Sequence, residues 1–286
     1  CHCDDVVTVV TTAGIGLFPR QYFAVSDGVV ASFYSLRCVL GKGGGFSATI
    51  SSMTQLTGAS ILIVGASGGL GSTLARELSQ KGARLTLAGR NADRLVAIGV
   101  PGAIAVGDVT APGVAESFVN EALSAHQGLD GIIYAAGAVA FGPAAEVTDE
   151  LADALWAVNT RGWMSVLRAS IPALTASAEA GRAPFALTLS GVVAEAPTAG
   201  LAAYSAVKAA LHAYGVATQR ELRRSGIRVI DARPGHTETE LSKHPLAGTA
   251  PVFPAGLAPE AVAARLVSAI EGDEKDLPSG SFLSLG

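Results

Sequence analysis

Short apolar runs alternate with amphipathic segments from about residue 53 to the C-terminal end of the chain. The runs are apolar on both faces, as parallel strands are when helices cover both sides of a sheet. Strands are predicted at 60–64, 84–88, 103–106, 129–134, 185–189 and 227–231, with a candidate last strand at 281–285. Helices are predicted at 70–80, 93–98, 114–125, 148–170, 201–224 and 259–270. This alternation predicts an α/β fold, a doubly wound parallel sheet in a single domain with helices on both faces.

The first 52 residues lack this alternation. No helix or strand period persists there for long, and glycines cluster near residues 41–45. We expect residues 1–52 to be a non-core or disordered leader or extension that contributes little to the core, and residues 53–286 to form the domain. The internal Met53 indicates a natural start, which would make residues 1–52 upstream reading frame, a leader or a cloning remnant. The alternative is a genuine but poorly ordered extension.

Charge and cysteine content narrow the classes of partner. The net charge is −4, which argues against a nucleic acid or a membrane surface as partner, because both need a basic stripe. No run reaches the roughly 18 consecutive apolar residues of a transmembrane helix. The cysteines are Cys1, Cys3 and Cys38, so the body has no disulfide framework and a cytoplasmic setting is expected. No metal is expected, since Cys1-His2-Cys3 lacks a matching second pair.

The first predicted strand runs into a glycine-rich turn and then a helix. Glycines at 65, 69 and 71 allow a tight turn and the close approach of a pyrophosphate to the helix N-terminus. Backbone N–H groups and the positive end of the helix would hold the phosphates. We predict a dinucleotide site, although the spacing G-x-x-x-G-x-G differs from the common G-x-G-x-x-G. The candidate contacts are Gly65, Ser67, Gly68, Gly69, Leu70 and Gly71.

The same residues, Gly65, Ser67 and Gly69, also spell G-x-S-x-G, the nucleophile elbow of α/β-hydrolases. That fold has several strands before the elbow and a histidine after it. Only one strand is predicted before Ser67, so a hydrolase with His236 or His244 as its base is the weaker alternative.

The second predicted strand ends at Ala88-Gly89-Arg90. In dinucleotide folds an acidic residue near this point binds the ribose 2′-hydroxyl of NAD, whereas an arginine accommodates the 2′-phosphate of NADP. Residues 88–91 contain no acid. Arg90 therefore favours NADP(H), with NAD(H) as the second choice. The alternative is an ordinary solvated arginine.

Tyr204 and Lys208 lie four residues apart in a strongly helical segment, which puts both on one face. A free tyrosine titrates near a pKa of about 10, too high for acid–base work at neutral pH. A nearby ammonium favours the phenolate and lowers that pKa. The Y-x-x-x-K spacing is common by chance, but its place after the fifth strand of a dinucleotide fold makes it informative.

The motifs, in their order along the chain, resemble those of the short-chain dehydrogenase/reductase family. They are residues 65–71, Asp108-Val109, Tyr134-Ala135-Ala136-Gly137, Asn159, Tyr204 with Lys208, and Pro234-Gly235 with Thr239, and they cover about residues 57–286. The resemblance implies a Rossmann-type fold. It further implies that Asp108 and Val109 contact the adenine, and that Ala135, Ala136 and Gly137 line the cofactor. The family often has Asn-Asn-Ala-Gly in that last position, so Tyr134 and Ala135 depart from its pattern.

The resemblance also implies the catalytic roles. Tyr204 would transfer the proton, and Lys208 would bind the nicotinamide ribose and tune Tyr204. Asn159 would support a water in the proton relay. Pro234, Gly235 and Thr239 would hold the nicotinamide carboxamide end.

One position departs from the family in a way that bears on catalysis. The family usually has a serine 13 residues before the tyrosine, and here that position is Gly191, with Ser190 beside it. Neighbouring strand residues point to opposite faces, so Ser190 can bind a substrate oxygen only if the strand ends or bulges there. Either Ser190 serves, or the site lacks this donor. In the second case Gly191→Ser is expected to raise kcat.

The sequence thus predicts an NADP(H)-preferring oxidoreductase that interconverts a small carbonyl substrate and its alcohol. Residues 236–257 are expected to form a mobile lid over the substrate. The apolar content of this lid favours a hydrophobic substrate. A non-catalytic NADP(H)-binding sensor or scaffold is the alternative. Apolar residues on several faces of helices 148–170 and 201–224 predict a homodimer or homotetramer.

Overall fold

The computed structural model describes residues 6–11, 14–19, 34–40 and 46–285. The chain divides into two units, Cys1–Thr54 and Gln55–Gly286. In the first unit, β1 (Val6–Thr11) pairs antiparallel with β2 (Gly14–Pro19), and β3 (Tyr34–Leu40) pairs antiparallel with β4 (Phe46–Ser52). The sequence pattern predicted none of these strands. The Val-Thr-rich composition of β1 explains why this segment is a strand, since β-branched residues favour extended backbone.

The second unit is built on a seven-stranded parallel sheet. Its strands are β5 (Ser60–Val64), β6 (Arg84–Gly89), β7 (Ala103–Val106), β8 (Gly131–Tyr134), β9 (Phe185–Leu189), β10 (Arg228–Ala232) and β11 (Asp276–Leu277). They lie in the order β11-β10-β9-β8-β5-β6-β7. The chain starts in the middle at β5, winds outward to β7, and returns to place β8 on the other side of β5. That reversal is the switch point where open α/β sheets form their ligand crevice.

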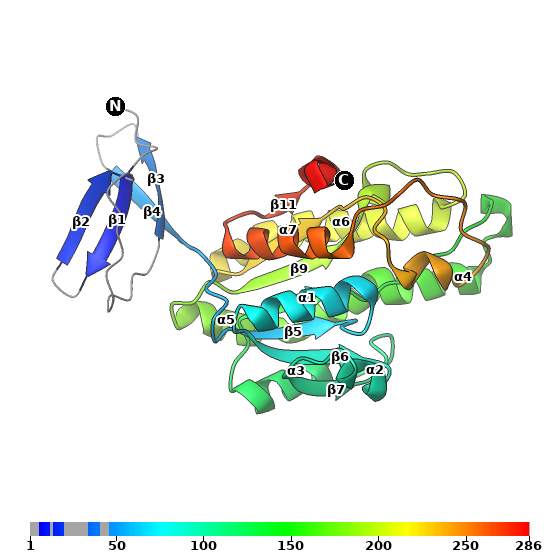
Figure 1. Ribbon diagram of the computed structural model, residues 1–286, viewed down its shortest axis with the longest axis horizontal. Helices are drawn as coiled ribbons and strands as arrows, with labels where there is room; N and C mark the ends of the chain where they lie inside the picture. Colours follow the sequence, from blue (N-terminus) through cyan, green and yellow to red (C-terminus); the bar gives the residue numbers. More distant parts are fainter. Residues whose placement is uncertain (1–5, 12–13, 20–33, 41–45, 286) are drawn as a thin grey trace. The chain divides into compact units, whose positions relative to one another are not determined.

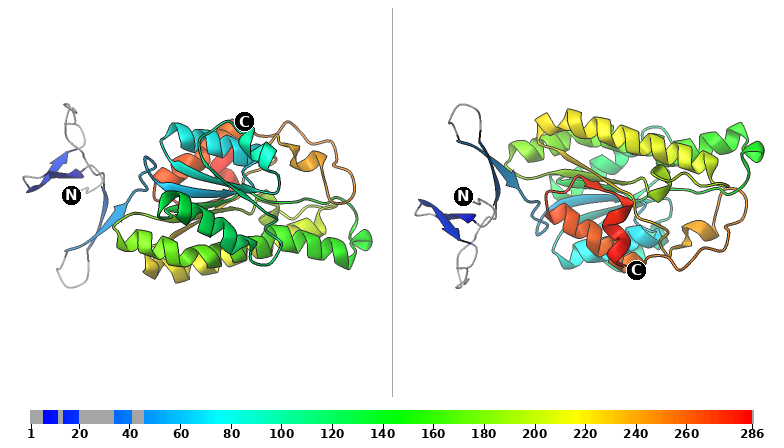
Figure 2. Two further views of the ribbon diagram at one scale, coloured as in Figure 1. Left: turned by 90° about the horizontal axis from the view of Figure 1, so that it is seen from below. Right: turned by 90° about the horizontal axis from the view of Figure 1, so that it is seen from above.

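Helices cover both faces of this sheet, and the sheet lies between the two helical layers in Figure 2. One face carries α1 (Gly69–Gln80), α2 (Ala92–Val96) and α7 (Pro259–Glu271), and the other carries α3 (Val114–His126), α5 (Gly162–Glu179) and α6 (Ala202–Leu222). Aliphatic side chains fill the first interface, including Leu74, Leu78 and Leu266. Phe118, Trp163 and Leu211 belong to the second. The doubly wound α/β prediction is therefore confirmed (Figure 1).

Two predicted elements differ from the structure in more than their end residues. The helix expected at 148–170 is α4 (Asp149–Trp156), a π-helix (Ala157–Arg161) and α5, which continues past Pro172. The last strand expected at 281–285 is wrong. Residues Ser279–Leu285 form a 3₁₀-helix that buries Phe282, and the last strand is β11, held by two residue pairs to β10.

No helix in the described part of the chain has the length and apolar character needed to cross a membrane.

Candidate active site

The glycine turn between β5 and α1 is packed too closely to admit side chains. Gly65 has φ +82°, and a Cβ there would lie 2.5 Å from the backbone nitrogen of Ala136. A Cβ at Gly71 would lie 2.3 Å from the Gly65 carbonyl oxygen, and one at Gly69 would lie 2.9 Å from the side chain of Thr239. Gly68 provides no side-chain cap for α1. The first N–H groups of α1 are therefore available to an anion at the crevice.

Two arginines flank this turn. Arg90 is exposed after β6, and its positive charge reaches Asp108, which follows β7. The Thr110 N–H and hydroxyl both donate to Asp108, and together with Arg90 they lower the pKa of that carboxyl below its ordinary value. Arg94, the third residue of α2, donates from Nη2 to the Ser67 carbonyl at 3.3 Å. Arg94 was not among the residues singled out from the sequence, although it lies four residues after Arg90.

Lys208 is buried on α6, one turn after Tyr204. Its Nζ donates to the Leu189 carbonyl at 2.7 Å and lies 5.6 Å from the centroid of the Tyr204 ring. Burial lowers the pKa of Lys208 to about 8, against an opposing effect of Asp231. The ammonium is therefore held by the carboxyl end of β9, at the same edge of the sheet as the glycine turn.

Tyr204 is half-buried in a small apolar cluster. Its neighbours there include Val139, Phe141, Leu201 and Phe253. Burial raises the pKa of Tyr204 above its ordinary value. Lys208 was expected to lower this pKa, but burial is the effect that determines the direction in this structure.

Asn159 lies in the π-helix and has a fully buried side chain. Its Nδ2 donates to the carbonyls of Ala138 and Leu155, each at 2.9 Å, and its Oδ1 accepts from the Ala138 N–H at 3.3 Å. A Cβ at Gly137 would lie 3.1 Å from Asn159 Oδ1 and 4.0 Å from Lys208 Nζ. Asn159 and Lys208 therefore both border Gly137.

The segment after β8 lies against the glycine turn. The Ala135 N–H donates to the Val64 carbonyl at 2.8 Å, and the Ala136 backbone faces Gly65. Tyr134, the last residue of β8, is buried and donates from its hydroxyl to the Val158 carbonyl at 2.5 Å. This segment therefore connects the turn to the π-helix.

Ser190 is engaged in a buried polar cluster behind the site. Strand β9 ends at Leu189, as the serine hypothesis requires. The Ser190 hydroxyl, however, lies 2.7 and 2.8 Å from the two carboxylate oxygens of Asp231. Asp231 also contacts His212 Nδ1 at 2.6 Å and Arg233 Nη1 at 2.8 Å. In this arrangement Ser190 donates to a carboxylate and not into the crevice.

Gly191, by contrast, borders open space. A Cβ there would meet only the Pro234 carbonyl, at 3.9 Å. Its backbone has φ +77° and ψ 163°, a conformation that is essentially restricted to glycine. Space would thus admit a serine, but the backbone disfavours it.

The segment after Gly235 folds over the site and is tied down at both ends. At its base the Glu238 N–H donates to the Leu257 carbonyl at 3.0 Å, and the Leu257 N–H donates to the His236 carbonyl at 2.8 Å. At its tip, Leu246 N–H donates to Val139 and Phe141 N–H to Ala247, at 2.8 and 2.9 Å. Thr239 lies against Gly69, so the lid reaches the glycine turn.

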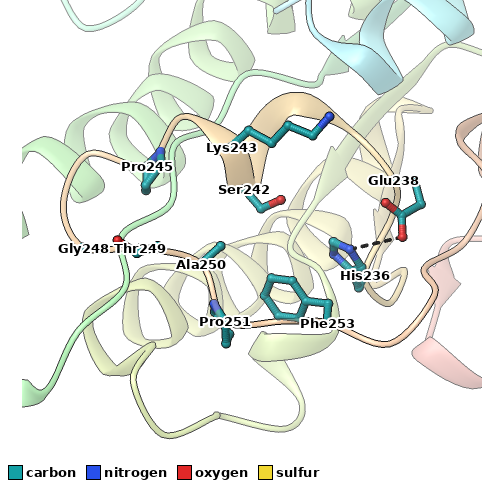
Figure 3. A pocket seen from close by; sticks show the side chains of 10 residues that line it. All are labelled: His236, Glu238, Ser242, Lys243, Pro245, Gly248, Thr249, Ala250, Pro251 and Phe253. Carbon is teal, nitrogen blue, oxygen red and sulfur yellow. Dashed lines mark ion pairs between the residues drawn. The ribbon is translucent and has the colours of Figure 1, made fainter.

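Residues of this segment line an open pocket of about 440 Å³ (Figure 3). The His236 ring stacks on Phe253 with centroids 4.4 Å apart, and its Nε2 lies 3.6 Å from Glu238. Apolar and polar groups share the lining, in His236, Glu238, Ser242, Lys243, Pro245, Gly248, Thr249, Ala250, Pro251 and Phe253. The predicted catalytic residues Tyr204, Lys208 and Asn159 do not line this pocket, so the expected hydrophobic substrate stays a prediction.

Two other predictions bear on this region. A hydrolase would need a histidine on Ser67, but Nε2 of His236 and of His244 lie 3.6 and 3.7 Å from carboxylate oxygens of Glu238 and Glu240. No group of three His, Cys, Asp or Glu side chains is arranged for a metal in the part of the chain that the structure describes. Cys1-His2-Cys3 lies outside the described residues.

Comparison with known proteins places the chain in a family. A family model described as short chain dehydrogenase matches residues 59–248, more than half of the chain. The chain belongs to the short chain dehydrogenase family. An uncharacterized oxidoreductase of Staphylococcus epidermidis is 30% identical over 186 residues, which span 64% of this chain and 79% of that protein.

Solved structures of the family share the fold. A short chain dehydrogenase from Burkholderia cenocepacia in complex with NADP has a TM-score of 0.68 and 26% identity, over 78% of this chain and 89% of that one. A 3-ketoacyl-(acyl-carrier-protein) reductase from Brucella melitensis complexed with NADH has a TM-score of 0.70 and 24% identity, over 79% of this chain and 99% of that one. The second likeness concerns the fold alone.

Proposed function

We propose that this short chain dehydrogenase is an NADP(H)-preferring oxidoreductase that interconverts a small carbonyl compound and its alcohol. The observation that carries the proposal is the Tyr204–Lys208 pair on α6, with Lys208 Nζ held by Leu189 and close to Gly137 and Asn159. All of these groups lie at the carboxyl edge of the sheet near the glycine turn, where ligands of this fold class bind.

The residues present fit a nicotinamide dinucleotide. The glycine turn forms a cradle in which Cβ atoms at Gly65 and Gly71 would clash with backbone, and α1 offers its N–H groups there. Gly65, Ser67, Gly68, Gly69, Leu70 and Gly71 would hold the pyrophosphate, Asp108 and Val109 the adenine, and Ala135, Ala136, Gly137, Pro234, Gly235 and Thr239 the nicotinamide half. When bound, the cofactor exchanges a hydride with the substrate carbon.

The chain's own residues would transfer the proton and stabilise the negative charge that forms on Tyr204. Tyr204 would donate its proton to the carbonyl oxygen during reduction and accept it during alcohol oxidation. Lys208 would stabilise the phenolate left on Tyr204 and bind the ribose, and Asn159 would support the return of a proton. The raised pKa of Tyr204 suits donation, since it keeps the phenol protonated at neutral pH.

Preference for NADP(H) is inferred from Arg90 and Arg94, two exposed cations beside Ser67 and the end of β6. A short-chain dehydrogenase from Sphingobium yanoikuyae, 25% identical with a TM-score of 0.69, was solved in complex with NADPH. The NADP complex of the Burkholderia protein gives further support. NAD(H) remains the second choice.

A non-catalytic NADP(H)-binding sensor is the alternative that one observation favours, namely the engagement of Ser190 by Asp231.

We also propose a cytoplasmic homodimer or homotetramer formed through α4, α5 and α6, on which Trp156 is 39% exposed. Light scattering that shows only monomer at micromolar concentration would contradict the assembly.

The reaction is tested by a panel of carbonyl compounds with NADPH, followed by the loss of NADPH absorbance. Tyr204→Phe should abolish turnover and leave NADPH bound, because only the proton donor is removed. NADPH binding without turnover on any carbonyl would favour the sensor. Full activity in Tyr204→Phe would overturn the proposed mechanism.

A further inference from the structure

The π-helix at Ala157–Arg161 deprives one backbone carbonyl of its usual partner. In an α-helix each N–H donates to the carbonyl four residues earlier, so Gly162 N–H would donate to Val158. Here Gly162 N–H donates to Ala157, five residues earlier. The Val158 carbonyl therefore lacks the donor that a continuous α-helix would supply.

Tyr134 supplies a donor from another element. Its hydroxyl, at the end of β8, donates to the Val158 carbonyl at 2.5 Å. The Tyr134 side chain is buried, and its ring meets the Trp163 ring edge-on with centroids 5.9 Å apart. Buried carbonyls are almost always paired, so this bond stabilises the π-helix at Ala157–Arg161, called the π-turn below, relative to a regular α-helix.

Gly162 makes room for the Tyr134 hydroxyl. A Cβ at Gly162 would lie 2.1 Å from the Tyr134 hydroxyl oxygen and 3.2 Å from its Cζ. A side chain at position 162 and a hydroxyl at position 134 therefore exclude each other. The two residues act as a matched pair across β8 and the start of α5.

The shape of the π-turn sets the place of Asn159, the residue after Val158. Its side chain fixes the backbone of Ala138 through two hydrogen bonds, and Gly137 lies between Asn159 and Lys208. A shift of the π-turn would therefore move Asn159 relative to Lys208 and to the segment after β8.

We propose that Tyr134 is a positioning residue, which holds the π-turn through the Val158 carbonyl and so keeps Asn159 beside Gly137 and Lys208. The catalytic consequence rests on the proposed function. The contact itself does not, since it depends only on Tyr134, Val158 and Gly162.

Kinetics test the role of Tyr134. Tyr134→Phe should lower kcat for NADPH-dependent carbonyl reduction by roughly tenfold to a hundredfold with KM nearly constant, because a displacement near 1 Å can cost about a hundredfold. Tyr214→Phe, which removes a hydroxyl from a half-buried ring on α6, is the matched control and should leave kcat unchanged. In an Asn159→Ala background, Tyr134→Phe should cost little more. Additive losses would mean that Tyr134 does not act through Asn159.

A second cycle tests the matched pair without using turnover. Gly162→Ala should lower the melting temperature of the native chain, and should lower it much less in Tyr134→Phe, where the hydroxyl that the new Cβ would meet is absent. Equal losses in the two backgrounds would contradict the contact.

Amide hydrogen exchange separates this inference from the reaction. The Ala138 N–H donates to Asn159, so Tyr134→Phe should speed its exchange roughly tenfold, and Tyr214→Phe should not. This result is readable even if no carbonyl oxidises NADPH, an outcome that would overturn the proposed reaction alone. Unchanged exchange at Ala138 would overturn the positioning role.

Discussion

At the scale of single residues, Asp231 changes the chemistry expected of Ser190. One carboxylate accepts hydrogen bonds from Ser190, His212 and Arg233, all within 2.8 Å. A serine has one O–H to donate. To donate to a substrate oxygen, Ser190 would therefore have to give up a bond to a buried negative charge. Of the two hydroxyls proposed as donors to that oxygen, Ser190 is thus the one engaged by a carboxylate, and we expect Tyr204 to supply the proton.

Substitutions at 190 and 191 test this assignment. Ser190→Ala should leave kcat nearly unchanged and lower the free energy of unfolding by about 1–3 kcal/mol, since Asp231 loses a donor. Gly191→Ser should not raise kcat, contrary to the expectation from sequence, because φ +77° imposes strain of about 1–3 kcal/mol on a serine. Urea titration and steady-state kinetics measure both. A collapse of kcat in a stable Ser190→Ala would restore Ser190 as the donor.

Arg90 carries the prediction of cofactor choice. A hydrogen bond from its guanidinium to a 2′-phosphate should contribute about 1.5–3 kcal/mol, or roughly 10- to 150-fold in affinity. Arg90→Ala should weaken NADPH by that factor and NADH hardly at all, as measured by cofactor fluorescence. Arg76→Ala removes the same charge from the exposed surface of α1 and serves as the control. Equal weakening of NADPH and NADH would show that Arg90 does not read the phosphate.

We expect Lys208 to make activity depend on pH, with Asp231 setting where the activity falls. Burial lowers the pKa of Lys208 to about 8 and Asp231 opposes this, so Asp231→Asn should lower that pKa further. If turnover needs the ammonium, the alkaline fall of kcat should move to lower pH in Asp231→Asn.

Asp276→Asn is the matched control for that shift. Asp276 also pairs with Arg233, at 2.7 Å, but its side chain is 59% exposed, so its replacement should leave the alkaline limb in place. Stability gives an independent reading. The folded pKa lies below the ordinary 10.5, so the unfolded chain binds more protons between the two values, and the free energy of unfolding should rise with pH across that window. An alkaline limb that stays put in Asp231→Asn would contradict the coupling.

At the scale of elements, the sequence pattern predicted what is locally encoded. The ranges Ser60–Val64, Ala103–Val106 and Phe185–Leu189 are strands with the bounds expected, because buried parallel strands are short apolar runs between turns. The π-helix could not be predicted in this way, since it depends on Tyr134 and Gly162 meeting in space. The two-residue β11 is likewise too short to leave a periodic signal.

The candidate site likewise has features that local spacing indicates and features that depend on contacts between residues distant in the sequence. Gly65, Tyr204 and Lys208 could be proposed from the sequence because their spacing along one turn or one helix indicates the chemistry. The engagement of Ser190 was missed because its partner Asp231 is 41 residues away, on a neighbouring strand. The position of Arg94, four residues after Arg90, is visible in the sequence, but only the fold shows that Arg94 reaches the Ser67 carbonyl.

At the scale of the whole molecule, the division of the chain near residue 54 predicts which part carries stability. The core clusters of the second unit begin with Leu56, which is 3% exposed, whereas Met53 is 44% exposed. Thr57, the next residue, donates from Oγ1 to the Lys81 carbonyl at 3.1 Å. The second unit therefore contains its own hydrophobic core and the first residues that anchor it.

A chain that begins at Met53 should keep the melting temperature of the full chain within about 2 °C, as changes that touch no core residue do. Its affinity for NADPH should also be unchanged. A chain that begins at Gly58 is the control, because it loses Leu56 and Thr57. Full burial of a leucine contributes about 1.5–3 kcal/mol, so this shorter chain should melt several degrees lower. If the chain from Met53 melted as low as the chain from Gly58, residues 1–52 would have to contribute to the stability of the domain.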